Sequence, residues 1–257
     1  MSSQAFSLAR RLRAGETVYS AWCSLPEPLV CEAIAREGFA AAVIDMQHGM
    51  WDETRAQQAV AQVHLAGAAP IVRVPLWHNS LVSRMLDWGA EGIIAPMING
   101  EAEARAFVQA AKYPPAGERS IGAHRAAMIA GVPDQKFYIA EANDTTLTFA
   151  MIETQAALDN LDRIAAMPGI DVLFVGPADL SFSLSNGATL DPHSAAVDKG
   201  LEKVLAACDR HNKIPGLFCR DAERAADKAK AGFKFLTVGS DLIFLRAGTA
   251  AQLKALR

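Results

Sequence analysis

Two acidic residues, Glu153 and Asp179, stand where neighbouring apolar runs of the chain end, and together they could hold a metal ion. The first run is LTFAMIE, and the second leads into GPADLS. Neither acid has a cysteine or histidine at ligand spacing, and carboxylate oxygens suit a hard cation that keeps several waters. The alternative is a structural role, because Asp179 could cap a helical turn that begins at L-S-F.

The stretch V-I-D-M-Q-H-G-M-W, residues 43–51, carries a second group with chemical potential. A single histidine after a strand is usually an ordinary loop residue. Here Asp45 comes shortly before His48, and a carboxylate can fix the tautomer of an imidazole and raise its basicity. Gly49 would let the chain turn sharply enough to keep the imidazole over a site. The stretch therefore predicts an acid–base group.

Arg73 lies between Val72 and Val74 in a run that is otherwise suited to burial. A buried guanidinium needs a partner. One interpretation is a structural ion pair with a carboxylate of the core. The other is a clamp for the carboxylate or keto oxygen of a substrate, which a planar guanidinium suits.

The elements that must position these residues follow a regular pattern. Apolar runs typical of parallel strands covered on both faces recur at residues 17–22, 41–46, 70–75, 92–96, 147–153, 171–176, 213–218 and 233–239. Helical patterns lie between or after them at residues 26–38, 52–67, 80–90, 101–112, 157–167, 194–211, 221–232 and 241–256, with Asp52 as a candidate N-cap.

Eight strands alternating with eight helices predict a (β/α)₈ TIM barrel that forms a single domain over residues 1–257. A doubly wound open sheet is the alternative, but no run has the charged character of an edge strand. We also expect a short helix from Gln4 to Arg13. The long connection from Lys112 to Thr146 is typical of a functional loop. Active-site residues of such barrels stand at the C-terminal ends of the strands, where the candidate residues fall.

Composition excludes several classes of partner. The net charge is -3, and no basic run is present, so neither nucleic acid nor a membrane is an expected partner. No stretch has the length of a membrane span or the apolar run of a signal peptide. Four scattered cysteines without a C-x-x-C spacing suggest reduced thiols and a cytoplasmic protein.

Several motifs occur in an order that resembles a known family. They are D-M-Q-H-G, V-R-V-P, K-Y-P-P-A-G-E-R-S-I-G, the glutamate that ends the fifth strand, and V-G-P-A-D-L-S. From Trp22 to Asp241 the chain resembles the HpcH/HpaI family of metal-dependent 2-oxo acid aldolases, the class II pyruvate aldolases. The resemblance implies reversible aldol cleavage and addition between pyruvate or a similar donor and an aldehyde, by way of a stabilised enolate.

The resemblance also implies roles for single residues. Glu153 and Asp179 would bind Mg²⁺, Mn²⁺ or Co²⁺, and Arg73 would hold the keto oxygen of the donor. His48, oriented by Asp45, would be the acid–base group, directly or through a water.

The resemblance also implies which further residues bind the substrate and which take part in assembly. Trp22 would line the pocket, and backbone N–H groups around Gly176, Pro177, Ala178 and Asp179 would receive the donor carboxylate, although Pro177 itself has no N–H. Asp87 would reach into the site of a neighbouring subunit. Relatives are hexamers, which implies a homo-oligomer whose last helix packs on the next subunit.

The sequence departs from the family at Met151, where a glutamine is usual. A thioether cannot donate the hydrogen bond that an amide could, so the arrangement of water or substrate near the metal is in question. The donor therefore stays open between pyruvate, hydroxypyruvate and oxaloacetate, and the aldehyde cannot be read from the sequence.

Three other functions are alternatives to a metal-dependent aldolase. An imine-forming aldolase needs a lysine at the C-terminal end of a strand, and none of the nine lysines falls there. A lyase for acyl-CoA thioesters, of the citrate or malyl-CoA type, needs a basic cluster for the CoA phosphates, and the sequence places no such cluster near the expected mouth of the barrel. A non-catalytic barrel could bind a 2-oxo acid without turning it over.

Overall fold

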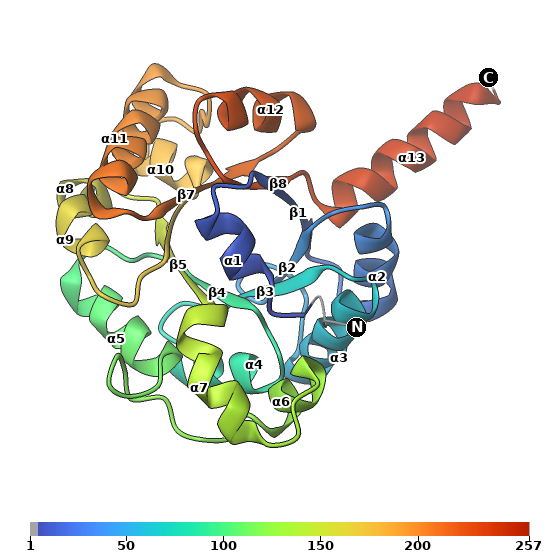
Figure 1. Cartoon of the computed structure of the whole chain (residues 1–257). Helices are drawn as coiled ribbons and strands as arrows, with labels where there is room; N and C mark the ends of the chain where they lie inside the picture. The colour runs from blue at the N-terminus through green and yellow to red at the C-terminus, as the bar shows by residue number, and fades with distance from the viewer. Residues whose placement is uncertain (1–4, 257) are drawn as a thin grey trace.

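The computed structural model describes residues 5–256, in which eight parallel strands close into a barrel. Each strand pairs with the next one along the chain, and β1 pairs with β8 to complete the ring (Figure 1). The strands are β1 (Val18–Cys23), β2 (Ala41–Asp45), β3 (Ala69–Arg73), β4 (Gly92–Ala95), β5 (Leu147–Ile152), β6 (Val172–Val175), β7 (Ile214–Cys219) and β8 (Phe235–Val238). The predicted (β/α)₈ barrel is confirmed, and the open sheet is excluded.

Helices surround the ring of strands. Those of the described residues are α1 (Leu8–Arg13), α2 (Pro28–Arg36), α3 (Glu53–Leu65), α4 (Asn79–Asp87), α5 (Glu101–Ala111), α6 (His124–Ala130), α7 (Gln135–Thr145), α8 (Gln155–Asp159), α9 (Leu161–Ala165), α10 (Pro177–Leu184), α11 (Ala195–His211), α12 (Ala222–Lys230) and α13 (Asp241–Ala255). The predicted N-cap of α3 is confirmed, since the Asp52 carboxylate accepts a hydrogen bond from the Arg55 N–H at 2.8 Å. None of these helices is long and apolar enough to cross a membrane.

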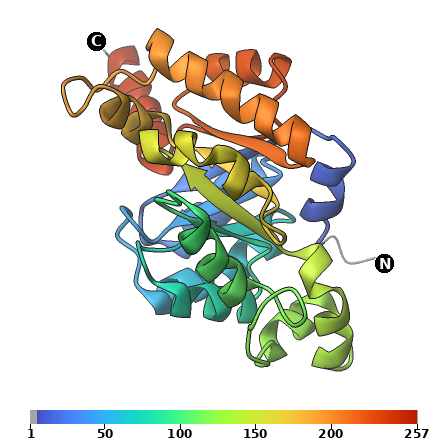
Figure 2. The same ribbon diagram turned by 90° about the vertical axis from the view of Figure 1, so that its left-hand side faces the viewer.

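Aromatic side chains fill the middle of the barrel. The ring of Phe149 lies 4.9 Å from that of Phe235 and 6.4 Å from that of Phe174, measured between centroids. At the N-terminal ends of the strands the short helix α1 lies across the barrel, as Figures 1 and 2 show. Its residues Leu8 and Leu12 are buried in the same apolar cluster as Phe149. This end of the barrel is therefore closed, and a substrate must enter from the other end.

Helical structure differs from the sequence-based expectation in four places. One is α10, which begins at Pro177 and was expected only as a turn that starts at Leu180. The first helix begins at Leu8, and Gln4 lies outside the described residues. The connection from Lys112 to Thr146 contains two helices, α6 and α7, because the alanine-rich stretches there bury their own small apolar cluster. The single helix expected over residues 157–167 is two short helices that meet at Asn160.

The last helix, α13, leaves the barrel instead of packing along it (Figure 1). Asp241 at its start is buried and accepts hydrogen bonds from the backbone N–H groups of Ser24 and Leu25 at 2.8 and 2.7 Å. Beyond that anchor the leucines at 242, 245, 253 and 256 are exposed. Apolar side chains of a helix are usually covered, and in this chain these leucines of α13 are left open to solvent.

Candidate active site

A pocket of about 180 Å³ opens where the C-terminal ends of the strands meet. It gathers side chains from the ends of six strands or the turns that follow them. Its lining consists of Trp22, His48, Arg73, Met151, Gly176, Pro177, Ala178, Asp179 and Phe218. Seven of these nine residues carry a role in the expected aldolase site, so the fold brings most of the predicted residues together.

Arg73 is fixed at the pocket by a two-pronged ion pair with Asp45. Its Nε and Nη2 donate to the two carboxylate oxygens at 2.8 and 2.7 Å. The guanidinium also lies 4.7 Å from the ring centre of Trp22, whose Nε1 donates to Asp45 at 3.2 Å. Burial alone would raise the pKa of Asp45, but the bonds from Arg73 outweigh it and the pKa lies below its ordinary value. Asp45 is therefore a carboxylate that holds Arg73 and Trp22 in place.

The third nitrogen of the Arg73 guanidinium points elsewhere. The sulfur of Met151, 4.0 Å from Nη1, is the contact that this nitrogen makes within the described residues. The ion pair with a core carboxylate is thus present, and the role of Arg73 as a substrate clamp stays a prediction. Nε and Nη2 form the structural ion pair, while Nη1 is a donor without a strong acceptor at the pocket wall.

His48 lines the pocket, but Asp45 contacts its backbone N–H and not, as expected, its imidazole ring. Asp45 Oδ1 accepts from the backbone N–H of His48 at 3.2 Å and of Gln47 at 3.1 Å. Across residues 5–256 no hydrogen bond to the imidazole itself is present, and the ring is exposed. The Asp45 carboxylate therefore positions the loop and leaves the ring free. Gly49 makes that loop possible, since a Cβ there would lie 2.2 Å from the Asp45 carbonyl oxygen.

The two acids differ in their surroundings. Glu153 is buried and its Oε1 accepts from the Met97 N–H at 2.8 Å, whereas Asp179 is exposed in the first turn of α10. Burial, to which the negative charge of Asp179 adds, raises the pKa of Glu153 to about 7. Gly176 is the N-cap of α10, and the Asp179 side chain makes no cap bond there, so the helix-capping alternative is not realised.

The turn at Gly176 brings α10 against Glu153. A Cβ at this position would lie 2.6 Å from Glu153 Oε2 and 2.6 Å from the methyl carbon of Met151. Glycine is thus required because backbone and carboxylate approach so closely. The same turn sets the backbone from Gly176 to Asp179 along one wall of the pocket.

The two carboxylates are suited to a hard divalent cation. The described part of the chain contains no group of three or more histidine, cysteine or acidic side chains that could enclose a metal. Magnesium and manganese sites often use only one or two carboxylates and complete their coordination with water and substrate oxygen. Glu153 and Asp179 fit that arrangement: Asp179 lines the pocket with Arg73, and Glu153 lies behind the wall at Gly176, where the charges of Asp179 and Arg73 both act on it.

Asp87 lies elsewhere, at the end of α4 near the N-terminal ends of the strands. Its carboxylate accepts from Arg119 at 2.6 Å. It does not line the pocket of its own chain. Its expected role in a neighbouring subunit stays a prediction.

Phe218 was not selected from the sequence, although the seventh strand was expected to end there. Its ring meets that of Trp22 edge-on, with centroids 5.2 Å apart. Only the position at a strand end could have identified it, because a phenylalanine carries no chemical signal of its own.

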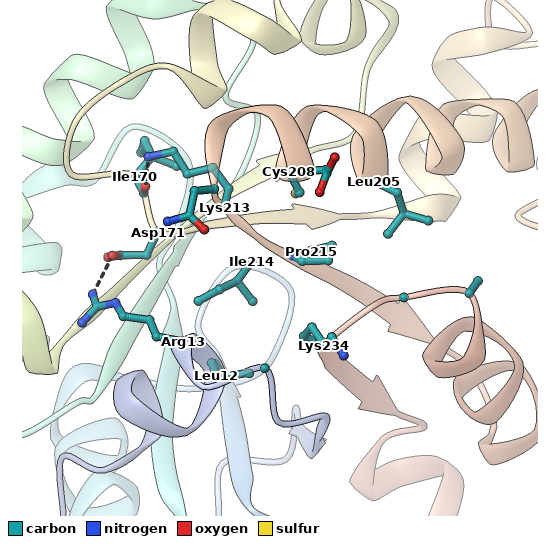
Figure 3. A pocket seen from close by; sticks show the side chains of 15 residues that line it. Leu12, Arg13, Ile170, Asp171, Leu205, Cys208, Lys213, Ile214, Pro215 and Lys234 are labelled. Carbon is teal, nitrogen blue, oxygen red and sulfur yellow. Dashed lines mark hydrogen bonds and ion pairs between the residues drawn. The ribbon is translucent and has the colours of Figure 1, made fainter.

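Size alone would point to the wrong end of the molecule. A much larger cavity, of about 630 Å³, lies beside α1 at the N-terminal ends of the strands (Figure 3). There Arg13 pairs with Asp171 at 2.9 Å, and the Lys213 amine donates to the Ile170 carbonyl oxygen at 2.8 Å. These polar groups are already paired, and the cavity lacks the convergent strand ends of the smaller pocket.

Comparison with known proteins places this barrel in a family. The model of the HpcH/HpaI aldolase/citrate lyase family matches residues 19–247. A hydroxypyruvate/pyruvate aldolase of Rhizorhabdus wittichii is 38% identical, with 91% of each chain covered. A 5-keto-4-deoxy-D-glucarate aldolase of Salmonella arizonae is 33% identical over 93% of this chain and 91% of its own.

A solved structure supports the same conclusion. The HpcH/HpaI aldolase/citrate lyase family protein of Burkholderia cenocepacia superposes with a TM-score of 0.89 at 32% identity, covering 98% of this chain and 100% of its own. The chain belongs to the HpcH/HpaI aldolase/citrate lyase family, as its motifs indicated.

Proposed function

We propose that the protein is a divalent-metal-dependent aldolase. It would form and cleave the bond between the methyl carbon of pyruvate, or the equivalent carbon of a similar 2-oxo acid such as hydroxypyruvate, and the carbonyl carbon of an aldehyde. The observation that carries this proposal is that Asp179 and the open nitrogen of Arg73 line one small pocket, while the Glu153 carboxylate lies against Gly176 in the wall of that pocket.

Each residue of the pocket has a task in this reaction. Glu153 and Asp179 would hold Mg²⁺, Mn²⁺ or Co²⁺, and the ion when bound would supply Lewis-acid polarisation of the keto group. Arg73 Nη1 would donate to the keto oxygen as negative charge develops there. The backbone N–H groups of Ala178 and Asp179 lie at the start of α10, where a donor carboxylate is favoured.

The proton that leaves the donor carbon needs an acceptor, and the exposed His48 imidazole is the group at hand. It would take that proton, directly or through a water, and return one to the oxygen of the aldehyde after the new bond forms. Because no residue between 5 and 256 forms a hydrogen bond with the ring, it would be free to turn toward either position.

The positions of the lysines argue against an imine-forming aldolase. No lysine lines the pocket, whereas Lys213 and Lys234 line the cavity at the opposite end of the barrel. An amine that attacks a keto carbon must stand beside it. The rival that cleaves acyl-CoA thioesters would be recognised by turnover of a malyl-CoA thioester, for which we expect none.

Substitution of the acids separates metal binding from proton transfer. We expect Glu153→Gln and Asp179→Asn each to lose Mn²⁺ binding, measured by calorimetry, together with aldol cleavage. His48→Ala should bind Mn²⁺ as the unchanged protein does and lose activity alone. If Mn²⁺ affinity fell equally in His48→Ala, the histidine would be a ligand and these roles would be wrong.

We also propose that the protein works as a homo-oligomer, a hexamer by analogy with the family, in the cytoplasm. The exposed leucines of α13 support an assembly in which this helix packs on the next subunit. In such an assembly Asp87 would contribute to a neighbouring site. The four cysteines are all free, as suits a reducing compartment.

A further inference from the structure

A second cavity, of about 400 Å³, adjoins the proposed active site and is more than twice its size. The two share Pro177, Ala178 and Phe218 in their linings. The half-buried Phe218 packs edge-on against Trp22 of the smaller pocket and also lines the larger one. The second cavity therefore begins where the smaller pocket ends.

Most of the second cavity is apolar. Leu190, Pro192, Leu217 and Ile243 form its walls together with the shared residues. Burial of apolar surface against such walls favours a ligand with a hydrophobic body.

Three basic residues, His193, Arg220 and Arg224, line the cavity beside these apolar walls, and their side chains are not equally available to a ligand. Arg224 donates to Asp198 at 2.9 Å, and Lys228 binds the same carboxylate at 2.7 Å. Arg220 is exposed and has no hydrogen bond or ion pair within the described residues. His193 is also exposed, and its backbone N–H donates to Asp191.

Two acids, one beside Arg220 in the chain and one near His193, accept hydrogen bonds from the backbone. Asp221 accepts from the Arg224 N–H at 2.8 Å as the N-cap of α12, and Asp191 accepts from the His193 N–H at 3.0 Å. The guanidinium of Arg220 is thus the charged group of this cavity that is left for a ligand. A planar guanidinium binds a carboxylate through two parallel hydrogen bonds.

From these observations we infer that the second cavity receives the acceptor, an aldehyde with an extended apolar body that ends in a carboxylate bound by Arg220. The inference rests on the proposed aldolase function, because the donor would fill the small pocket and the acceptor must approach from its open side. Arg220 would then determine which aldehydes are used.

A rigid pair of aldehydes tests this inference. Steady-state kinetics with saturating pyruvate and Mn²⁺ would compare 4-carboxybenzaldehyde with 4-methylbenzaldehyde, which has a similar shape without the charge. The unchanged protein should prefer the carboxylate at least tenfold in kcat/KM. Arg220→Gln should reduce that preference to about twofold or less, mainly through a higher KM for the charged aldehyde.

Two further variants make the result specific. Leu190→Glu places a negative charge in the cavity wall and should weaken 4-carboxybenzaldehyde more than 4-methylbenzaldehyde. Arg105→Gln removes the same charge as Arg220→Gln from α5, where Arg105 pairs with Glu101, and should leave the preference as it was.

Deuterium exchange into the methyl group of pyruvate, measured without aldehyde, keeps this inference separate from the proposed function. If the unchanged protein exchanges deuterium but shows no preference between the two aldehydes, or keeps its preference in Arg220→Gln, the inference is overturned and the aldolase function stands. If it neither exchanges deuterium nor joins pyruvate to either aldehyde, the proposed function itself fails.

Discussion

At the scale of single residues, the site depends on which groups the three nitrogens of the Arg73 guanidinium contact. Two nitrogens are committed to Asp45, which fixes the plane of the guanidinium, and the third faces the pocket and the sulfur of Met151. A group held in this way needs little rearrangement when charge develops on a nearby oxygen. A lysine could not make both contacts, because it is a point charge without the fork.

The first prediction concerns that third nitrogen. Arg73→Ala should lower kcat by about a hundredfold or more, the size expected when one transition-state donor is lost. Mn²⁺ binding, measured by calorimetry, should persist because Glu153 and Asp179 remain. A loss of less than about threefold would show that Arg73 serves only the ion pair with Asp45.

Position along the chain explains which site residues the sequence could predict. Glu153, Asp179, Arg73 and His48 stand at strand ends, so a barrel brings them together whatever the details of packing. The partner of the Asp45 carboxylate could not be predicted, because the sequence offers two candidates for it, Arg73 and the His48 ring. Only the register of β2 with β3, which sets Asp45 opposite Arg73, decides this in favour of the arginine.

At the scale of elements, the turn from β6 into α10 couples the two acids. Gly176 lets the backbone pass within contact distance of Glu153, and α10 then carries Asp179 to the same pocket. A displacement of this turn would move the two carboxylates apart.

We therefore predict that Gly176→Ala weakens Mn²⁺ binding at least tenfold, because its Cβ would displace the Glu153 side chain or the turn itself. Gly100→Ala is a matched control. A Cβ at Gly100 would lie 3.4 Å from its nearest neighbour, which is ordinary contact, so Mn²⁺ affinity should not change. Equal Mn²⁺ affinity in both variants would contradict the close approach at Gly176.

Helix α1 offers a second prediction at this scale. Glu91, buried at the start of β4, accepts from the backbone N–H groups of Phe6 and Leu8 at 2.7 and 3.1 Å. Burial raises the pKa of Glu91 from 4.5 to about 7, even though these bonds oppose the rise. In the unfolded chain the carboxyl ionises near its ordinary pKa, so the folded protein binds the extra proton between these two values.

The stability that Glu91 contributes is consequently full at low pH and is lost as pH rises through about 7, by about 3 kcal/mol at most. The urea midpoint in EDTA should fall more between pH 5 and pH 8 for the unchanged protein than for Glu91→Gln. Glu153 affects both proteins alike and cancels in the comparison. Parallel changes in the two midpoints would show that Glu91 does not carry this proton.

The elements themselves follow the sequence closely where apolar runs are long. All eight strands lie within a residue or two of their expected limits, because each run must be buried on both faces. The connection between α5 and β5 was harder to predict. Its helices α6 and α7 bury small residues such as Ala126 and Ala142 under Tyr113 and Tyr138, and this is tertiary packing that no local pattern displays.

At the scale of the whole molecule, α13 is the unusual feature. Figure 1 shows it projecting from the barrel, and its leucines at 242, 245, 253 and 256 are exposed. An isolated subunit would expose this apolar helix to water, which supports the proposed assembly.

The corresponding prediction is that Leu245→Glu combined with Leu253→Glu shifts the protein toward the monomer. Each charge would have to be buried in the contact that we propose, at a large cost. Light scattering coupled to gel filtration would give the mass. Gln252→Glu changes charge on the same helix and should leave the mass as it was. An unchanged mass in the double variant would mean that α13 does not hold the subunits together.

The central claim is that Glu153 and Asp179 act on a 2-oxo acid through a divalent cation. Proton NMR of pyruvate in D₂O with the purified protein measures this most directly, because loss of the methyl signal reports removal of a proton from the donor. We predict that exchange stops in EDTA and returns with Mn²⁺. Exchange that continues undiminished in EDTA would contradict the account.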